Sequence, residues 1–227
     1  MSKNLRKIAE SLHKQGKANP GLMNYAIPDL WFTAKSKIDH LKVPDGHVLV
    51  NPYLFYEAVI NEVFLSKDDQ ELQPYFLDHK VEKKLANGNW IKRSNVYSMM
   101  IRSSGSFDHD RTGALENENL NGLKDTGTFI KTLAYLPTLK RIGVDVLYLL
   151  PIAKYSLKDK KGELGSPYGV SNFYALDSLL KDPMSPDTTV EEEFKAFVEA
   201  AHLLDMKVII DIIPRTNSVN SDMILDH

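Results

Sequence analysis

Cysteine is absent from this sequence of 227 residues, which excludes disulfides, thiolate zinc sites and a cysteine nucleophile. Neither sign of charge predominates: the formal net charge is -2, so the chain has no electrostatic footprint for nucleic acid or an anionic membrane. No run approaches the ~18 apolar residues of a membrane span, and the polar start MSKNLRKIAESLHK lacks the apolar core of a signal peptide. We therefore expect a soluble, cytoplasmic protein that binds neither nucleic acid nor a membrane.

Composition and pattern point to a folded chain with two parts. Hydrophobic residues make up 43% of the sequence and charged residues 26%, enough to bury a core. An amphipathic helix is expected over residues 5–13, and residues 48–64 mix strand and helix signals. We expect residues 1–90 to form a small N-terminal subdomain of uncertain topology, and residues 91–227 to form the second part.

In the second part, apolar strands alternate with amphipathic helices. Strands are expected near 95–101, 145–151 and 207–213, and helices from Thr128 and Thr189, the latter with a capping box. Such units build either an open doubly wound sheet or a (β/α)8 barrel, with parallel strands and the ligand site at their carboxyl ends. No Gly-rich turn supports a nucleotide, and we expect no cofactor.

Polar side chains that follow these strands are candidates for ligand binding. Asp211 ends an apolar strand, where an ionised carboxylate needs a partner, so it belongs either to a site or to a buried structural pair. Tyr168, in the SPYG segment, either packs on its loop or stacks on a ligand. Three cations are candidates for sugar or phosphate binding, with a solvated or ion-paired side chain as the alternative for each: Arg102, Lys161 and Arg215.

A long segment, residues 106–126, is rich in Gly, Asn, Asp and Glu and is expected to be a surface loop. Its run Asp108-His109-Asp110 would suggest a metal, but no second ligand set stands at a diagnostic spacing. We interpret this run as a solvated loop and expect no metal site.

Three segments taken together resemble the α-amylase superfamily, glycoside hydrolase family 13. They are LKRIGVDVLYLLPI, SPYGVSNFYALD and FKAFVEAAHLLDMKVIIDIIP, in an order and spacing similar to the first three β/α units of that family. The resemblance covers roughly residues 95–222 and implies the N-terminal part of a (β/α)8 barrel. KVIIDIIP is similar to the family's first conserved region, in which Asp, two apolar residues, any residue, Asn and His follow a strand. Arg215 and Thr216 stand where the Asn and His are usual, so the calcium and sugar contacts of those two positions are not implied here.

Within the superfamily, the chain most closely resembles the maltosyltransferase branch, through DIIPRTNSVNSD, the KKG element and WIKRSNVYSMMIRSS. Those enzymes move maltosyl units between α-1,4-glucans, or from maltose 1-phosphate, through a covalent glycosyl-enzyme intermediate. The resemblance implies that Tyr168 stacks on the sugar at the cleaved bond. It also implies that Asp211 holds an arginine beside the nucleophile.

The resemblance further implies that the nucleophile and the general acid lie beyond His227, after later strands of the barrel. We therefore expect an N-terminal portion of a larger enzyme, inactive alone, whose open barrel edge allows self-association. Two alternatives stay open: an amylase-type hydrolase or isomerase of the same superfamily, and a non-catalytic fragment or glucan-binding scaffold.

Overall fold

The structure of the protein is a computed structural model. It describes residues 2–32, 38–66, 89–160, 162, 165–213 and 218–222. The α-helices are α1 (Lys3–Ala18), α2 (Pro52–Ala58), α4 (Ile101–Ser104), α5 (Phe129–Leu133), α6 (Leu136–Arg141) and α7 (Val190–Leu203), and α2 continues as a π-helix over Val59–Phe64. Short 3-10 helices span Asp29–Trp31, Asn89–Arg93 and Ser178–Leu180. The strands are β1 (Tyr25–Pro28), β2 (His40–Lys42), β3 (His47–Val50), β4 (Val96–Met99), β5 (Val146–Leu149), β6 (Ala153–Tyr155), β7 (Val170–Leu176) and β8 (Lys207–Ile210).

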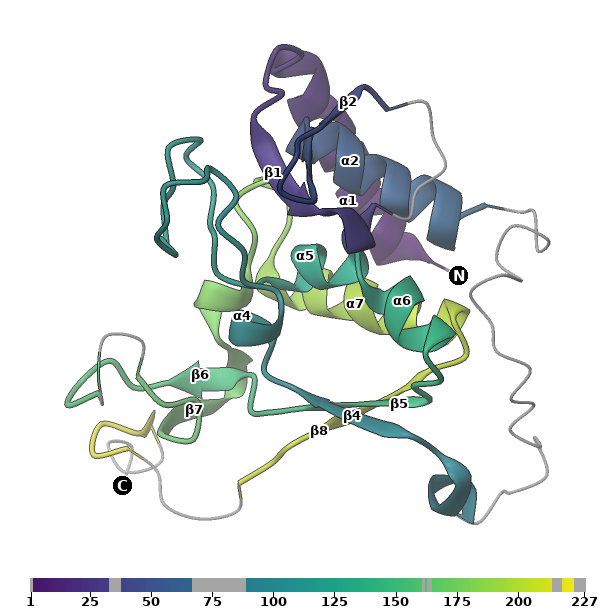
Figure 1. Cartoon of the computed structure of the whole chain (residues 1–227). Coiled ribbons are helices and arrows are strands. Elements are labelled where there is room, and N and C mark those ends of the chain that lie inside the picture. Colours follow the sequence, from purple (N-terminus) through teal and green to yellow (C-terminus); the bar gives the residue numbers. More distant parts are fainter. Residues whose placement is uncertain are drawn as a thin grey trace.

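A three-stranded parallel sheet, in the order β4-β5-β8, forms the centre of the second part of the chain. Val96 lies opposite Val146, and Val146 lies opposite Lys207, so the three strands start in register. Helices α5 and α6 connect β4 to β5, and α7 connects the β6–β7 hairpin to β8; all three helices lie on the same side of the sheet (Figure 1). The predicted parallel arrangement of the three strands is confirmed.

The helix starts follow from local sequence. The Thr189 side chain accepts a hydrogen bond from Glu192 N, and the Glu192 side chain accepts one from Thr189 N, which confirms the predicted capping box. Thr128 caps α5 by accepting from Lys131 N. The helical segment predicted from Thr128 breaks after α5 and restarts at α6 with Pro137 in its first turn, a position that proline tolerates because no intrahelical N–H bond is lost there.

The face of the parallel sheet that lies away from α5, α6 and α7 is partly exposed. Val96 is 49% exposed, and it shares this face with Tyr148 because it lies opposite Val146, two residues before Tyr148 in β5. In the described part of the chain no helix covers this face, and the sheet does not close into a barrel (Figure 1). The structure therefore shows a mixed α/β fold with a parallel sheet. This part of the fold prediction is confirmed, and the complete barrel stays a prediction.

The N-terminal part consists of α1, α2 and an antiparallel sheet in the order β1-β3-β2. Helix α1 is longer than the predicted 5–13, and the mixed signal of residues 48–64 divides into β3 and α2. Glu199 of α7 accepts hydrogen bonds from Asn4 and from the backbone N–H of Leu5, and Lys7 pairs with Glu192 at 2.7 Å. Buried apolar side chains of both parts form one cluster, and the boundary near residue 90 stays a prediction. None of the helices in the described residues is both long and apolar enough to cross a membrane.

Candidate functional site

The candidate site lies at the carboxyl ends of β5 and β8, where the chain leaves the parallel sheet. The Asp211 N–H donates to Leu149 O at 2.8 Å, which extends the ladder one residue beyond β8 and fixes the Asp211 backbone beside the end of β5. A cavity of about 290 Å³ adjoins this edge, and Asp211 lines it together with Ile152, Val170, Phe194 and Ile210. The edge thus combines one carboxylate with apolar walls, an arrangement found in ligand sites.

Two tyrosines converge on Asp211. The Tyr168 hydroxyl donates to Asp211 Oδ2 at 3.1 Å. Partial desolvation and the hydrogen bond to the Asp211 carboxylate raise the pKa of Tyr168, and the same two causes raise the pKa of Tyr148 in β5. Tyr168 keeps 45% of its surface exposed, so its ring remains accessible to a ligand. The structure therefore brings together two of the five predicted site residues, Tyr168 and Asp211.

Tyr148 was missed by the sequence analysis, which treated VDVLYLLPI as a uniformly apolar strand. A signal was present, because tyrosine is the one hydroxyl-bearing residue among the apolar positions of β5. Neighbours in a strand point to opposite faces, so Tyr148 points away from the face used by Leu147 and Leu149. That alternation would have assigned Tyr148 to the face not covered by the helices.

Arg102, predicted to bind substrate, lies in α4 directly after β4. Its guanidinium donates to the Tyr155 hydroxyl at 3.2 Å and to the Gly165 carbonyl at 3.3 Å, and its Cζ lies 5.2 Å from the centre of the Tyr155 ring. With 5% of its surface exposed, Arg102 offers little area to a ligand. Its role in substrate binding stays a prediction.

The remaining predicted site residues, Lys161 and Arg215, lie outside the described residues, as does Thr216. Their assignment to sugar or phosphate binding stays a prediction from sequence.

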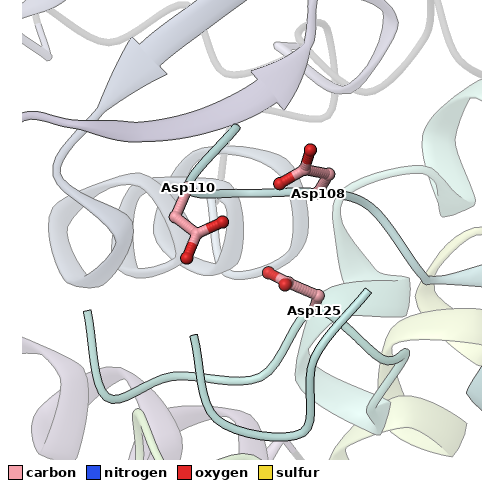
Figure 2. A group of neighbouring side chains, drawn as sticks. All are labelled: Asp108, Asp110 and Asp125. Atoms are coloured by element: carbon pink, nitrogen blue, oxygen red, sulfur yellow. The ribbon is translucent and has the colours of Figure 1, made fainter. Parts of the chain in front are cut away.

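A group of carboxylates appears in the segment 106–126, where the sequence indicated a solvated loop without a metal. Oxygens of Asp108, Asp110 and Asp125 all lie within 4.8 Å of one another, and the three side chains face a common space (Figure 2). Asp125 is fully buried. Oxygen ligands of this kind suit a hard cation such as Ca²⁺.

Hydrogen bonds within the loop account for this cluster without a cation. Gly113 N donates to Asp108 Oδ2 at 2.7 Å and Leu120 N to Asp110 Oδ2 at 2.7 Å, while Asp125 accepts from the N–H groups of His109 and Glu116. Backbone donors thus offset the three negative charges and order the loop. We assign no ion to it.

His109 shows that the solvated interpretation of this run is wrong for its central residue. Its ring is fully buried, stacks on Tyr25 at 4.0 Å between centroids, and hydrogen-bonds the Ala26 carbonyl through Nδ1 at 2.7 Å. Burial, reinforced by the nearby Lys131 charge, lowers the pKa of His109 to about 2. His109 is therefore a neutral packing residue that fastens the loop to β1.

Comparison with known proteins finds distant, partial similarity to glucan-active enzymes. No protein-family model matches the chain. The alpha-1,4-glucan:maltose-1-phosphate maltosyltransferase of Mycolicibacterium smegmatis is 30% identical over 156 residues, which are 62% of this chain and 20% of that enzyme. The 1,4-alpha-glucan branching enzyme GlgB of Synechocystis is 25% identical over 89% of this chain and 26% of its own length.

Among solved structures, an alpha-amylase from Lactobacillus plantarum aligns over 60% of this chain and 26% of its own, at 28% identity and a TM-score of 0.45. The chain spans about a fifth to a quarter of the length of the two curated relatives. The curated relatives that it matches are distant homologues from the α-amylase superfamily, glycoside hydrolase family 13, and maltosyltransferases are the most frequent among them.

Proposed function

We propose that this chain forms the first strands of a (β/α)8 catalytic domain that transfers maltosyl units between α-1,4-glucans or from maltose 1-phosphate. The observation that carries the proposal is the Tyr168–Asp211 pair at the carboxyl edge of a parallel sheet. Similarity to a maltosyltransferase that is named for maltose 1-phosphate supports the choice of donor.

In this proposal the two residues have separate tasks. The exposed Tyr168 ring stacks on the apolar C–H face of a pyranose, while its hydroxyl is held by Asp211. Asp211 keeps the ring at a fixed angle and accepts hydrogen bonds from donors brought to the edge. Both roles concern binding and orientation, and neither residue is assigned to bond cleavage.

Cleavage with retention needs two carboxylates about 5–5.5 Å apart, one as nucleophile and one as general acid and base. We assign neither to a residue of this chain. In the proposed function, these carboxylates come from the remainder of a complete barrel, and this chain supplies the sugar-stacking edge of the site.

Two other functions stay in competition. A hydrolase of the same superfamily is favoured by the similarity to the trehalose-6-phosphate hydrolase of Bacillus subtilis, 30% identical over 55% of this chain and 17% of that enzyme. A glucan-binding scaffold would need only the Tyr168–Asp211 edge. Transfer and hydrolysis differ in how well acceptor sites exclude water.

We expect the purified chain to produce no new oligosaccharides from maltoheptaose, with or without maltose 1-phosphate, because it holds no assigned catalytic pair. Product chromatography after prolonged incubation tests this, and the Tyr168→Ala variant serves as the matched control for contaminating enzymes. Elongated glucans that the wild type makes and Tyr168→Ala does not would show that the site is complete in this chain. New reducing ends without elongation, again lost in the variant, would favour the hydrolase.

We also propose that the unpaired edges of the parallel sheet allow two copies to associate. Strands β4 and β8 are its outermost strands in the described residues, and their backbone groups are available for pairing.

A further inference from the structure

We infer that Arg102 is a positioning residue that sets the placement of Tyr168 over Asp211. The inference rests on the proposed function, because that function gives the Tyr168–Asp211 pair its role in glucan binding. The effect of Arg102 on the position of Tyr168 does not depend on any substrate. Arg102 is 5% exposed and holds Tyr155 and Gly165, so it acts on Tyr168 through the segment that carries Tyr168.

Arg102 is itself held firmly at the end of β4. Its carbonyl accepts hydrogen bonds from Gly127 N at 2.8 Å and from the Ser106 hydroxyl at 2.6 Å. Gly127 packs so tightly there that an added Cβ would lie 2.0 Å from the Ile101 carbonyl oxygen. The guanidinium therefore extends from a fixed piece of backbone at the edge of the parallel sheet.

The two prongs of the guanidinium bind two different points of the segment that follows β6. One contacts the hydroxyl of Tyr155, the last residue of β6, and the other contacts the carbonyl of Gly165. Gly165 has φ +66°, and an added Cβ would lie 2.6 Å from the Tyr155 ring. Tyr155, Gly165 and the guanidinium thus pack as one unit.

A short rigid turn connects this unit to Tyr168. Tyr168 N donates to Ser166 Oγ at 3.3 Å and Gly169 N to Ser166 O at 3.0 Å, while Ser156 N reaches Gly169 O at 2.8 Å. Only Ser166 and Pro167 separate Gly165 from Tyr168, so we expect a shift of the Gly165 carbonyl to move the Tyr168 ring. The Tyr168–Asp211 bond of 3.1 Å would not survive a displacement of about an ångström, because hydrogen bonds weaken steeply beyond their normal range.

Arginine suits this task and lysine does not. The planar guanidinium presents several donors in a fixed fork and lies flat against an aromatic ring, whereas an ammonium is a single point charge. We therefore expect Arg102→Lys to retain the charge and to lose the simultaneous hold on Tyr155 and Gly165.

The test is NMR of the full chain with ¹³C-labelled tyrosine, in which Tyr168→Phe assigns the Tyr168 ring signal. Arg102→Ala and Arg102→Lys are expected to move that signal toward the position of a freely exposed tyrosine and to lower the pKa of Tyr168 toward its ordinary value. Gly165→Ala, which leaves Arg102 intact and pushes on Tyr155, is expected to move the same signal. Leu133→Ala, a core truncation 1% exposed in α5, is the control: it lowers stability and leaves the Tyr168 signal in place.

Outcomes separate this inference from the proposed function. A Tyr168 signal unchanged in Arg102→Lys would overturn the positioning role, and so would an equal shift in Leu133→Ala. If Arg102→Ala does not fold, the lysine and Gly165 variants decide alone. Binding of maltoheptaose is measured on the same samples: its absence from wild type would refute the glucan site, while a displaced Tyr168 in the Arg102 variants would still uphold the positioning role.

Discussion

Phe197→Ala is expected to lower the free energy of unfolding by about 3–5 kcal/mol, the range for truncating a buried phenylalanine. Phe197 is 0% exposed and lies on the side of α7 that packs against α5, with its ring centroid 6.0 Å from that of Phe129. Removing the ring leaves a cavity between α7, α5 and the parallel sheet. A loss of this size is a large part of the stability of a single domain.

Phe194→Ala provides the matched comparison, because Phe194 lies one turn earlier on α7 and is only half-buried, where it lines the cavity beside Asp211. We expect it to cost clearly less than Phe197→Ala. Urea unfolding monitored by circular dichroism measures both. Equal losses, or a Phe197 variant as stable as wild type, would contradict the packing of α7 described here.

We expect the free energy of unfolding to depend strongly on pH because of the buried side chain of Glu193. This side chain is 1% exposed in the first turn of α7. Its Oε2 accepts a hydrogen bond from Asp182 N at 2.9 Å, and its Oε1 accepts one from the Thr188 hydroxyl at 3.1 Å. Burial, reinforced by the neighbouring Asp182 carboxylate, raises the pKa of Glu193 from 4.5 to about 8.

The charge of Lys181 does not reverse this shift. Its Nζ lies 3.7 Å from Glu193 Oε1, which is longer than the distance of about 2.7–2.9 Å in a charge-assisted hydrogen bond. The Lys181 Nζ donates instead to the Asp182 and Ser185 carbonyls. Burial therefore decides, and Glu193 is protonated in the folded protein at neutral pH.

The sign of the stability change follows from proton linkage. Between pH 4.5 and about 8 the folded chain retains a proton on Glu193 that the unfolded chain has lost, so stability falls as pH rises. His109 acts in the opposite direction below pH 6.5, since the unfolded chain binds a proton there that the folded chain does not. Lys131, with a pKa lowered by burial to about 8, makes stability rise again above that pH.

Between pH 6.5 and 8 the decline attributable to Glu193 should outweigh the opposite contribution of Lys131, which begins in the same interval, and reach at most about 2 kcal/mol at 1.36 kcal/mol per pH unit. Glu193→Gln, which keeps the shape, an acceptor for the Asp182 N–H and an amide that can donate to the Thr188 hydroxyl, should flatten the curve in this interval. Urea midpoints measured every half pH unit test this. A wild-type curve that is flat or rising from pH 6.5 to 8 would show that Glu193 is ionised in the folded state.

Much of the fold could be predicted because its determinants are local. The capping box at Thr189, the cap at Thr128 and the apolar runs of β5 and β8 are all short-range patterns, and the parallel order follows from crossover handedness. The strand-end rule likewise made Tyr168 and Asp211 separate site candidates, and the structure brings their side chains together across 43 residues of sequence.

What could not be predicted depends on contacts between distant segments. His109 is buried because Tyr25 of β1 stacks on it, and no pattern near His109 indicates that partner. The sequence correctly placed Arg102 after β4. The direction of its side chain is set by hydrogen bonds to Tyr155 and Gly165, which belong to the later β6–β7 hairpin. Side-chain orientation at a strand end therefore requires the tertiary structure.

We propose that the carboxyl edge of the parallel sheet binds α-1,4-glucan through Tyr168 and Asp211. An NMR titration of the labelled chain with maltoheptaose tests it most directly. We predict saturable shifts, with a Kd of about 1 mM, at Tyr168 and the amide of Asp211, lost in Tyr168→Ala and retained in Tyr97→Ala, a 37% exposed tyrosine of β4. No saturable shift, or shifts confined to the N-terminal helices α1 and α2 and unaffected by Tyr168→Ala, would contradict it.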